Sequence, residues 1–457
     1  MGVAISSWSL ARAVAQQGQM GVVSGTGIDT VLTRRLQVGD IGGHVRRALD
    51  HFPIPEIAEH IWERYFVAGG KAEDAAYKSK PVPSLKPHRN FTDLLVVANF
   101  VEVFLAKEGH PGPVGLNLLE KIQIPTIASL YGAMLAGVDY VIMGAGIPRA
   151  IPKVLDSLSE GHVTTMDINV TGAQPGDAPV QMTFDPNVYC GGGIKRPNFL
   201  AVVSSTMLGQ LLAKRTDRPV DGFVIEGATA GGHNAPPRGQ VQLNERGEPI
   251  YGEKDVPDLE KFVEFGLPFW LAGSYAGRLK EAQSYGAQGV QVGTAFAFCE
   301  ESGMRPDLRQ RVLDMVKQGT ADVYTDPLAS PTGFPFKVVQ EETSISDVTQ
   351  YLKRGRICDL GYLREVYRKD DGSVGYRCAS EPEDDYVAKG GAMDETQGRK
   401  CLCNGLLATA GFPQVRQGVV EPHVLTAGDD VVNLGKFFKN GDTRYTAADV
   451  IEYLLKT

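Results

Sequence analysis

The stretch Leu267-Pro-Phe-Trp-Leu-Ala-Gly-Ser274, followed by Gly286-Ala-Gln-Gly-Val-Gln-Val-Gly-Thr294, decides the fold class. Each run is short, apolar and closed by small residues, which is typical of a buried β-strand that ends in a tight turn. A helical stretch, about Arg278 to Tyr285, joins the two runs. Strands that are joined through a helix are expected to lie parallel in one sheet.

Five further runs repeat this pattern upstream. They span Gly21 to Ser24, Val114 to Leu118, Tyr140 to Gly144, Phe199 to Ser204 and Gly222 to Glu226. Helical patterns lie between several of them, at Leu10 to Gln17, Ile127 to Ala136 and Thr206 to Lys214. Alternating strands and helices predict an α/β protein with a parallel sheet.

The last two strands end in turns that suit a phosphate group. Gly273 and Ser274 follow one strand, and Gly293 and Thr294 follow the next. Such turns offer free backbone N–H groups and hydroxyls to an anion. In (β/α)8 barrels the loops after strands seven and eight frequently form a phosphate site. The alternative is that these glycines only punctuate the strand ends.

The segment Glu226-Gly-Ala-Thr-Ala-Gly-Gly-His233 places a histidine at the end of a glycine-rich loop. Glycine lets the backbone approach a flat ligand closely, since no Cβ intervenes. Histidine exchanges protons near neutral pH, so His233 is the candidate acid or base. The simpler interpretation is a surface histidine beside turn glycines.

Taken together, these segments resemble the nitronate monooxygenase (2-nitropropane dioxygenase) family, which includes related flavin-dependent enoyl and quinone reductases. The matching pieces occur in the family's order over roughly the first two thirds of the chain. They are Met1-Gly-Val3, Leu10-Ala-Arg-Ala-Val-Ala15, Gly21-Val-Val-Ser-Gly-Thr26, Val114-Gly-Leu-Asn117, Gly144-Ala-Gly-Ile-Pro148, Ala230-Gly-Gly-His233, Leu271-Ala-Gly-Ser274, Gln291-Val-Gly-Thr294 and Glu300-Glu-Ser302.

The resemblance implies an FMN-binding (β/α)8 TIM barrel with His233 beside the flavin. Asn117 and Gln291 are then expected to hydrogen-bond the flavin ring. FMN is expected rather than FAD, since neither phosphate turn adds a glycine-rich pyrophosphate loop. The expected cofactor contacts are Gly2, Val3, Asn117, Gly144, Gly146, Glu226, Gly231, Gly232, Ala272, Gly273, Ser274, Gln291, Gly293 and Thr294.

The implied reaction is oxidation of an alkyl nitronate with O₂, with His233 as acid or base. Two alternatives stay open. The first is a reductase that takes electrons from NAD(P)H and passes them to an enoyl or quinone acceptor. The second is a flavin-binding scaffold subunit that docks a partner and catalyses nothing.

The resemblance also predicts how the chain is divided. Family members carry a strand immediately before the segment that matches Gly2-Val3, so we expect a barrel that lacks its first strand. The barrel is expected over residues 1–297, with insertions at about 35–93 and 163–195. The second insertion alternates apolar and polar residues at Val180 to Phe184, which predicts a hairpin or flap. Residues 298–457 are expected to form a lid and a cysteine-containing C-terminal region.

A dinucleotide-binding fold is a rival interpretation. Tyr140-Val-Ile-Met-Gly-Ala-Gly-Ile-Pro-Arg-Ala150 imitates a strand and a glycine-rich turn, and Asp167 follows about twenty residues after the turn. Pro148 lies in the middle of the supposed phosphate turn, and the other glycine loops are left unexplained. The barrel is therefore favoured.

Four of the six cysteines occur within fewer than fifty residues of the C-terminal region, at Cys358, Cys378, Cys401 and Cys403. In a cytosolic protein, clustered cysteines bind metal more often than they form disulfides. Four thiolates suit a structural zinc ion, although these spacings fit no standard zinc finger. The alternative is four separate buried thiols.

Composition agrees with a cytoplasmic enzyme that acts on a small molecule. The chain has 457 residues and a net charge of −8, so we expect neither a nucleic-acid footprint nor a basic membrane face. The most apolar run, Leu94 to Ala106, contains Asn99 and Glu102, so no membrane span is expected. The sequence leaves the formation of a homo-oligomer open.

Overall fold

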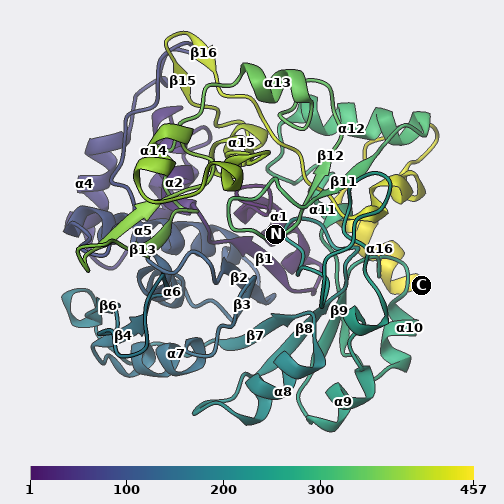
Figure 1. Ribbon diagram of the computed structural model, residues 1–457, viewed down its shortest axis with the longest axis horizontal. Coiled ribbons are helices and arrows are strands. Elements are labelled where there is room, and N and C mark those ends of the chain that lie inside the picture. Colours follow the sequence, from purple (N-terminus) through teal and green to yellow (C-terminus); the bar gives the residue numbers. More distant parts are fainter. Residues whose placement is uncertain (1) are drawn as a thin grey trace.

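Seven parallel strands form the centre of the protein (Figure 1). The computed structural model describes residues 2–457, so Met1 of the family segment lies outside it. The strands are β1 (Gly21–Ser24), β2 (Val114–Leu119), β3 (Tyr140–Gly144), β7 (Asn198–Val203), β8 (Gly222–Glu226), β9 (Phe269–Ala272) and β10 (Gly289–Gln291). They neighbour one another in chain order. The seven predicted strands and the α/β class are confirmed.

Helices lie before, between and after the strands of the sheet. They are α1 (Trp8–Gln16), α2 (Ile28–Gln37), α5 (Arg89–Lys107), α6 (Thr126–Leu135), α7 (Ile151–Glu160), α8 (Thr206–Lys214), α9 (Leu259–Glu264), α10 (Leu279–Ser284), α11 (Thr294–Ala297) and α12 (Pro306–Gln318). The Ser205 side chain caps α8 by accepting a hydrogen bond from the Leu208 backbone at 3.1 Å. The four helices predicted between strands are confirmed within one or two residues.

The sheet is a barrel with one strand missing. In the described residues β1 and β10 each have one strand neighbour and do not pair with each other. Both nevertheless line a single cavity, through Val22 on β1 and Val290 on β10. Helix α1 and the C-terminal helix α16 (Ala447–Lys456) contribute Leu10 and Leu454 to this cavity at the seam. The expected barrel lacking a strand is therefore confirmed.

This strand order rules out the dinucleotide-binding fold. A doubly wound sheet reverses its strand order at a switch point, where the nucleotide binds. Here the order proceeds without reversal from β1 to β10. Asp167, the supposed ribose ligand, belongs instead to the hairpin of β4 (Thr164–Asp167) and β6 (Gln181–Phe184), where it accepts a hydrogen bond from Gln181 at 2.8 Å.

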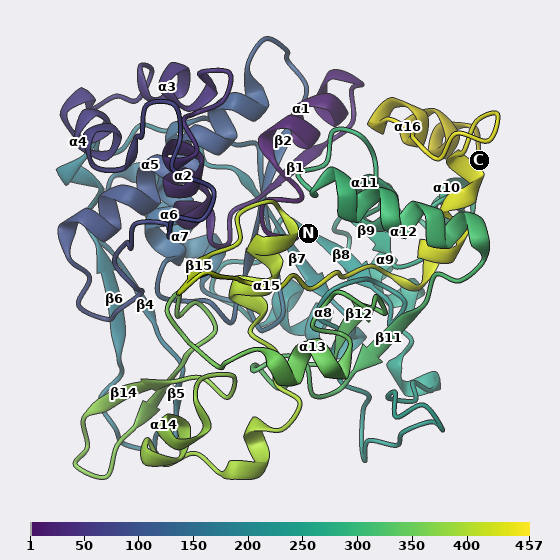
Figure 2. The same ribbon diagram turned by 90° about the horizontal axis from the view of Figure 1, so that it is seen from above.

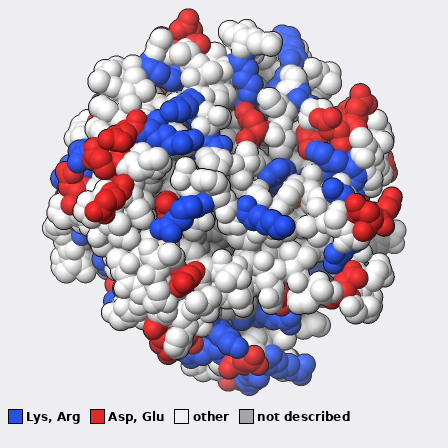
Figure 3. Space-filling view, turned by 90° about the vertical axis from the view of Figure 1, so that its left-hand side faces the viewer, with Lys and Arg blue, Asp and Glu red and all other residues white. Residues whose placement is uncertain are grey.

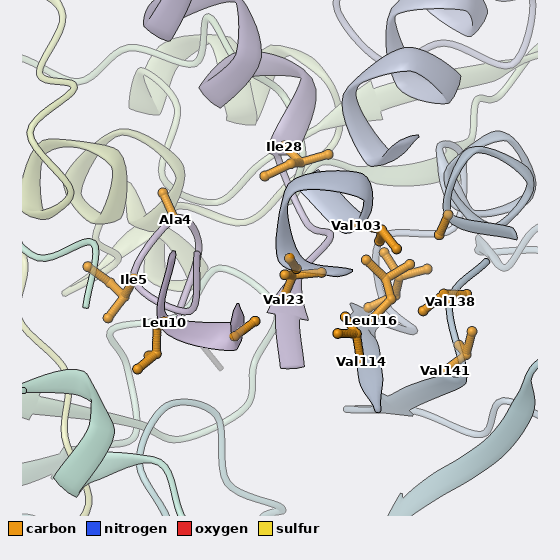
Figure 4. Packing of buried hydrophobic residues seen from close by; sticks show 14 of the residues in the cluster. Ala4, Ile5, Leu10, Val23, Ile28, Val103, Val114, Leu116, Val138 and Val141 are labelled. Atoms are coloured by element: carbon orange, nitrogen blue, oxygen red, sulfur yellow. The ribbon is translucent and has the colours of Figure 1, made fainter. Parts of the chain in front are cut away.

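The two faces of the sheet bury different cores. Outside the barrel, apolar side chains of the strands pack against the helices, and Figure 4 shows Val103 of α5 next to Leu116 of β2. Inside the barrel, a smaller apolar cluster contains Ile142, Leu200, Val224 and Ala272. This division follows from the alternation of side chains along each strand.

The two stretches predicted as insertions contain elements that do not belong to the barrel sheet. The first contains α3 (His44–Leu49) and α4 (Pro55–Tyr65) and then continues to α5 without a regular element. In the second, β4 and β6 pair antiparallel, so the predicted hairpin is confirmed. The short strand β5 (Val170–Thr171) leaves this hairpin and pairs with β13 (Glu365–Arg368) of the C-terminal region.

The C-terminal region packs against the barrel and shares its core. Its remaining elements are β11 (Val323–Asp326), β12 (Phe336–Val339), α13 (Val348–Lys353), β14 (Val374–Arg377), α14 (Glu383–Ala388), α15 (Leu402–Thr409), β15 (Val415–Arg416) and β16 (Val419–Val420). Leu425, Val431 and Phe437 belong to the same apolar core as the barrel helices. Figure 2 shows the yellow C-terminal chain crossing the middle of the molecule between α15 and α16.

Charge is distributed without a dominant sign on the face that Figure 3 shows, where Lys and Arg alternate with Asp and Glu. Arg46 of α3, for example, pairs with Asp50 and Glu59, each at 2.8 Å. In residues 2–457, no helix combines the length and the apolar character needed to cross a bilayer.

Candidate active site

A cavity of about 590 Å³ lies inside the barrel and extends to the carboxyl ends of its strands. Its size is that of a cofactor or small-molecule site. The predicted residues that line it are Gly2, Val3, Asn117, Gly144, Glu226, Gly231, Gly232, His233, Ala272, Gly273, Ser274, Gln291, Gly293 and Thr294. Residues that are far apart in the sequence thus meet around one space.

Gly146 is the exception, since it does not line the cavity. A Cβ at this position would lie 1.8 Å from Oε2 of Glu120, so the glycine makes room for a buried carboxylate next to the strand ends. The prediction of a cofactor contact at Gly146 is therefore not supported by its position. Its neighbour Ala145 lines the cavity instead and has a positive φ of 56°.

Strand pairing relates the polar candidates to their neighbours on two sides of the barrel. Glu226 on β8 pairs with Ala272 on β9, which in turn pairs with Gln291 on β10. On the other side, Asn117 of β2 pairs with Ser24 of β1. The Asn117 amide nitrogen donates to the carbonyl of Ile142 at 3.1 Å, which leaves its oxygen for a ligand.

His233 lies in the cavity wall and is held by the C-terminal region. Its Nε2 and the hydroxyl of Ser330 share a hydrogen bond of 2.7 Å. The ring of Phe336 stands edge-on to the imidazole, with ring centroids 4.8 Å apart. Because Nε2 is engaged by Ser330, Nδ1 is the ring nitrogen left for a ligand. Burial lowers the pKa of His233 to about 4, so the ring is neutral at neutral pH.

Glu226 is the second titratable group of the cavity. Its side chain is partly exposed because it faces the cavity, yet it lies deep inside the protein. Burial raises the pKa of Glu226 to about 7, since a carboxylate is poorly stabilised away from water. The charge of Glu226 in the cavity wall therefore changes near neutral pH.

The two predicted phosphate turns differ in local form, since Gly273 has a positive φ and Gly293 has a φ of −110°. Gly273 has a φ of +90°, and a Cβ there would lie 2.9 Å from the Thr229 hydroxyl, so the turn requires glycine. Ser274 also has a positive φ, of 57°. In the second turn, the Thr294 hydroxyl accepts a hydrogen bond from the backbone N–H of Gly428 at 2.9 Å.

The C-terminal chain covers these turns through individual residues that we did not predict. The backbone N–H of Asp429 donates to the Thr229 carbonyl at 3.0 Å, and the N–H of Gly232 donates to the Thr426 hydroxyl at 3.0 Å. Asp430 lines the cavity within hydrogen-bonding reach of Thr294, and burial raises the pKa of this carboxyl. No local sequence pattern distinguishes Ser330, Thr426 or Asp430, because their role comes from contacts with distant residues.

The four C-terminal cysteines do not form a metal site in this structure. Cys378 shares a hydrogen bond of 3.2 Å with the Ser380 hydroxyl, and the Asn404 side-chain amide donates to Cys401 at 3.5 Å. Of the four, Cys403 lines the cavity. Across residues 2–457, no three His, Cys, Asp or Glu side chains are arranged as a formed metal site. The predicted tetrahedral spacing is thus absent from the described residues.

Comparison with known proteins points to one family. The nitronate monooxygenase family model matches residues 198–323, which contain β7 to β10, His233 and both phosphate turns. A probable nitronate monooxygenase of Bacillus subtilis (strain 168) is 35% identical over 101 residues, or 21% of this chain and 27% of the relative. One of Staphylococcus haemolyticus (strain JCSC1435) is 37% identical over 112 residues, or 23% of this chain and 30% of the relative. The match therefore spans less than a third of either relative.

Solved structures resemble the whole chain more loosely. FabK from Thermotoga maritima aligns with 99% of this chain and 88% of its own, at a TM-score of 0.46 and 15% identity. A nitroalkane oxidase from Streptomyces ansochromogenes aligns with 100% of this chain and 93% of its own, at a TM-score of 0.46 and 12% identity. The fold assignment accordingly rests on the sheet order, and the family assignment rests on the sequence match. The predicted resemblance is confirmed: residues 198–323, which carry the candidate catalytic histidine, match the nitronate monooxygenase family model.

Proposed function

We propose that this protein is an FMN-dependent oxidoreductase that oxidises alkyl nitronates with O₂. The observation that carries the proposal is the position of His233, a buried neutral imidazole in the wall of a barrel cavity and within the segment that matches the family. Membership of the family supports the flavin, and the small-molecule substrate follows from the size of the cavity.

The residues around the cavity fit FMN. Apolar side chains such as Val202, Val224 and Trp270 line the barrel interior and suit a flat aromatic ring. The turns at Gly273 and Gly293 lie on neighbouring strands and suit its phosphate. Asp430 lines the cavity beside the second turn, where burial raises the pKa of its carboxyl.

Bound FMN supplies an electron acceptor for the substrate carbon. The protein orients the substrate and provides a group that accepts or holds its proton. Neutral His233 can accept a proton from a nitroalkane through Nδ1, while Ser330 holds the ring at Nε2. When the substrate is already a nitronate anion, its charge raises the pKa of His233 and lets the ring hold a proton next to that anion.

The test is the identity of the cofactor and its response to substrates. We expect heat to release FMN, and we expect an alkyl nitronate to bleach the visible flavin spectrum under anaerobic conditions. Recovery of FAD, or of no flavin, would contradict the proposal. Bleaching by NADH or NADPH alone would instead identify a reductase, and no bleaching by any of the three would identify a flavin-binding scaffold.

The charge of Glu226 predicts a pH dependence. Above its pKa of about 7 the carboxylate is negative and repels an anionic substrate, whereas below that pH it is neutral. We therefore expect kcat/KM for a nitronate to fall about tenfold as the pH rises from about 6 to about 9, a change of roughly 1.4 kcal/mol.

The variant Glu226→Gln is expected to remove this fall, because the amide does not ionise. The matched control is Glu120→Gln, since burial also raises the pKa of Glu120 but its side chain does not line the cavity. The pH profiles of all three proteins are measured with the same nitronate. A fall that persists unchanged in Glu226→Gln would assign it to another group.

A further inference from the structure

The C-terminal region gives the active-site cavity an apolar wall. Four of its side chains belong to one apolar cluster and also line the cavity, and they are Phe336, Leu363, Leu402 and Leu406. All four follow the seven barrel strands in the sequence. Their cluster is separate from the one inside the barrel that contains Val224. Together with Tyr362, which also lines the cavity, we call these residues the C-terminal pocket.

The C-terminal pocket begins beside His233. The backbones of His233 and Phe336 pair in an isolated antiparallel bridge, and the two rings stand edge to face with centroids 4.8 Å apart. Leu402 packs in the same cluster as Phe336. A substrate group that extends from His233 past Phe336 therefore enters apolar surroundings.

Helix α15 turns one face toward the cavity. Leu402 and Leu406 are four residues apart, so they lie on the same face of this helix. Leu402 is buried, whereas Leu406 and Leu363 are only partly buried and line the cavity. Partly buried leucines in a cavity wall still have apolar surface to remove from water, and an alkyl chain can cover that surface.

Tyr362 contributes its ring to the pocket, because protein groups already bind its hydroxyl. The hydroxyl shares a hydrogen bond of 2.6 Å with Thr30 and donates another to the carboxylate of Asp29. Asp29 is fully buried and pairs with the Lys80 ammonium at 2.7 Å. These contacts fix the ring as part of an apolar wall.

The charges around the cavity disfavour a second anionic group on the substrate. The lining side chains include the carboxyl groups of Glu226 and Asp430, but within residues 2–457 they include no Lys or Arg. A carboxylate at the far end of a substrate would lose its water in the C-terminal pocket without gaining a positive partner, which is costly. An uncharged chain avoids this penalty.

We propose that the C-terminal pocket binds the alkyl tail of the substrate, so that the preferred substrates are nitronates with an uncharged chain several carbons long. This inference rests on the proposed function, since it places the reacting carbon at His233. Burial of one additional methylene in an apolar pocket strengthens binding about fourfold. Chain length and terminal charge are therefore the two properties that the pocket selects.

The first test is kcat/KM of the full-length flavoprotein for the nitronates of nitroethane, 1-nitrobutane, 1-nitrohexane and 4-nitrobutanoate. We expect kcat/KM to rise at least about tenfold from nitroethane to 1-nitrohexane. We also expect it to be at least about tenfold lower for 4-nitrobutanoate than for 1-nitrobutane, because only the former carries a carboxylate. Equal values along the alkyl series, or faster turnover of 4-nitrobutanoate, would overturn the inference and leave the proposed function intact.

A variant assigns the tail to this pocket. Leu406→Gln keeps a side chain of similar size and a good helix former but puts an amide into the pocket. The ratio of kcat/KM for 1-nitrohexane to that for nitroethane should fall at least about fivefold. The control is Leu352→Gln on α13, which changes a side chain that is 74% exposed and should keep the original ratio. An unchanged ratio in Leu406→Gln would place the tail elsewhere.

A binding measurement separates failure of the pocket from failure of the proposed reaction. 1-Butanol and 1-octanol carry alkyl chains without a nitro group, and their affinities are measured by calorimetric titration. We expect 1-octanol to bind at least about tenfold more tightly than 1-butanol, and to lose at least about fivefold in affinity in Leu406→Gln but not in Leu352→Gln. That result without turnover of any nitronate would contradict the proposed function and support the pocket. Equal affinities of the two alcohols would overturn the pocket.

Discussion

Replacing His233 with alanine is expected to lower kcat/KM by at least about tenfold and by as much as about 10⁴-fold, the range expected of a positioned acid–base group. The physical reason is that neutral His233 is the candidate group to take or hold the substrate proton at the cavity wall. Bound flavin should remain, because His233 is not part of either phosphate turn. Steady-state kinetics and the flavin content per chain check both parts.

Two further variants make the His233 experiment specific. His162→Ala removes an exposed histidine that pairs with Glu160 at 3.1 Å, and it should leave kcat/KM unchanged. Ser330→Ala keeps the imidazole but removes its 2.7 Å hydrogen bond, so a smaller loss in kcat than that of His233→Ala is expected. If His233→Ala has unchanged kinetics with every substrate that turns over, His233 has only a structural role.

Replacing Gly273 with alanine is expected to weaken FMN binding by at least about tenfold, since a left-handed backbone costs an L-residue roughly 1–2 kcal/mol. The φ of +90° disfavours any side chain, and the new Cβ would lie 2.9 Å from the Thr229 hydroxyl and 3.3 Å from the Ala230 nitrogen. The turn must then shift, and its N–H groups no longer face the phosphate. Fluorescence titration of the flavin-free protein with FMN measures the change.

Gly266→Ala is the matched control for this experiment. Gly266 also has a positive φ, of 71°, but a Cβ there meets nothing within 4 Å, and it does not line the cavity. It should lower stability through backbone strain while leaving the affinity for FMN unchanged. Equal losses of affinity in both variants would attribute the effect to strain alone and remove Gly273 from the phosphate site.

The sequence by itself determined the strands, the order of the barrel and the position of His233. Strands such as β8 and β9 can be located because a buried parallel strand is a short apolar run, and its end is marked by glycine or another small residue. These are local signals, carried by neighbouring residues. The glycine turn at Gly273 was predictable for the same reason, since its positive φ and its close approach to Thr229 require glycine at that single position. Gly293, in contrast, has a φ of −110°, and a Cβ there would meet nothing within 4 Å.

Only the tertiary structure decided which of these groups meet and what covers them. Ser330 contacts His233 although the two residues are 97 positions apart in the sequence, and Asp429 contacts Thr229 across 200 positions. No local sequence pattern could therefore predict either contact. Gly146 carries the family motif, yet it packs against buried Glu120, and its neighbours Gly144 and Ala145 line the cavity instead. The charge states of His233 and Glu226 likewise arise from burial, which depends on the whole fold and not on adjacent residues.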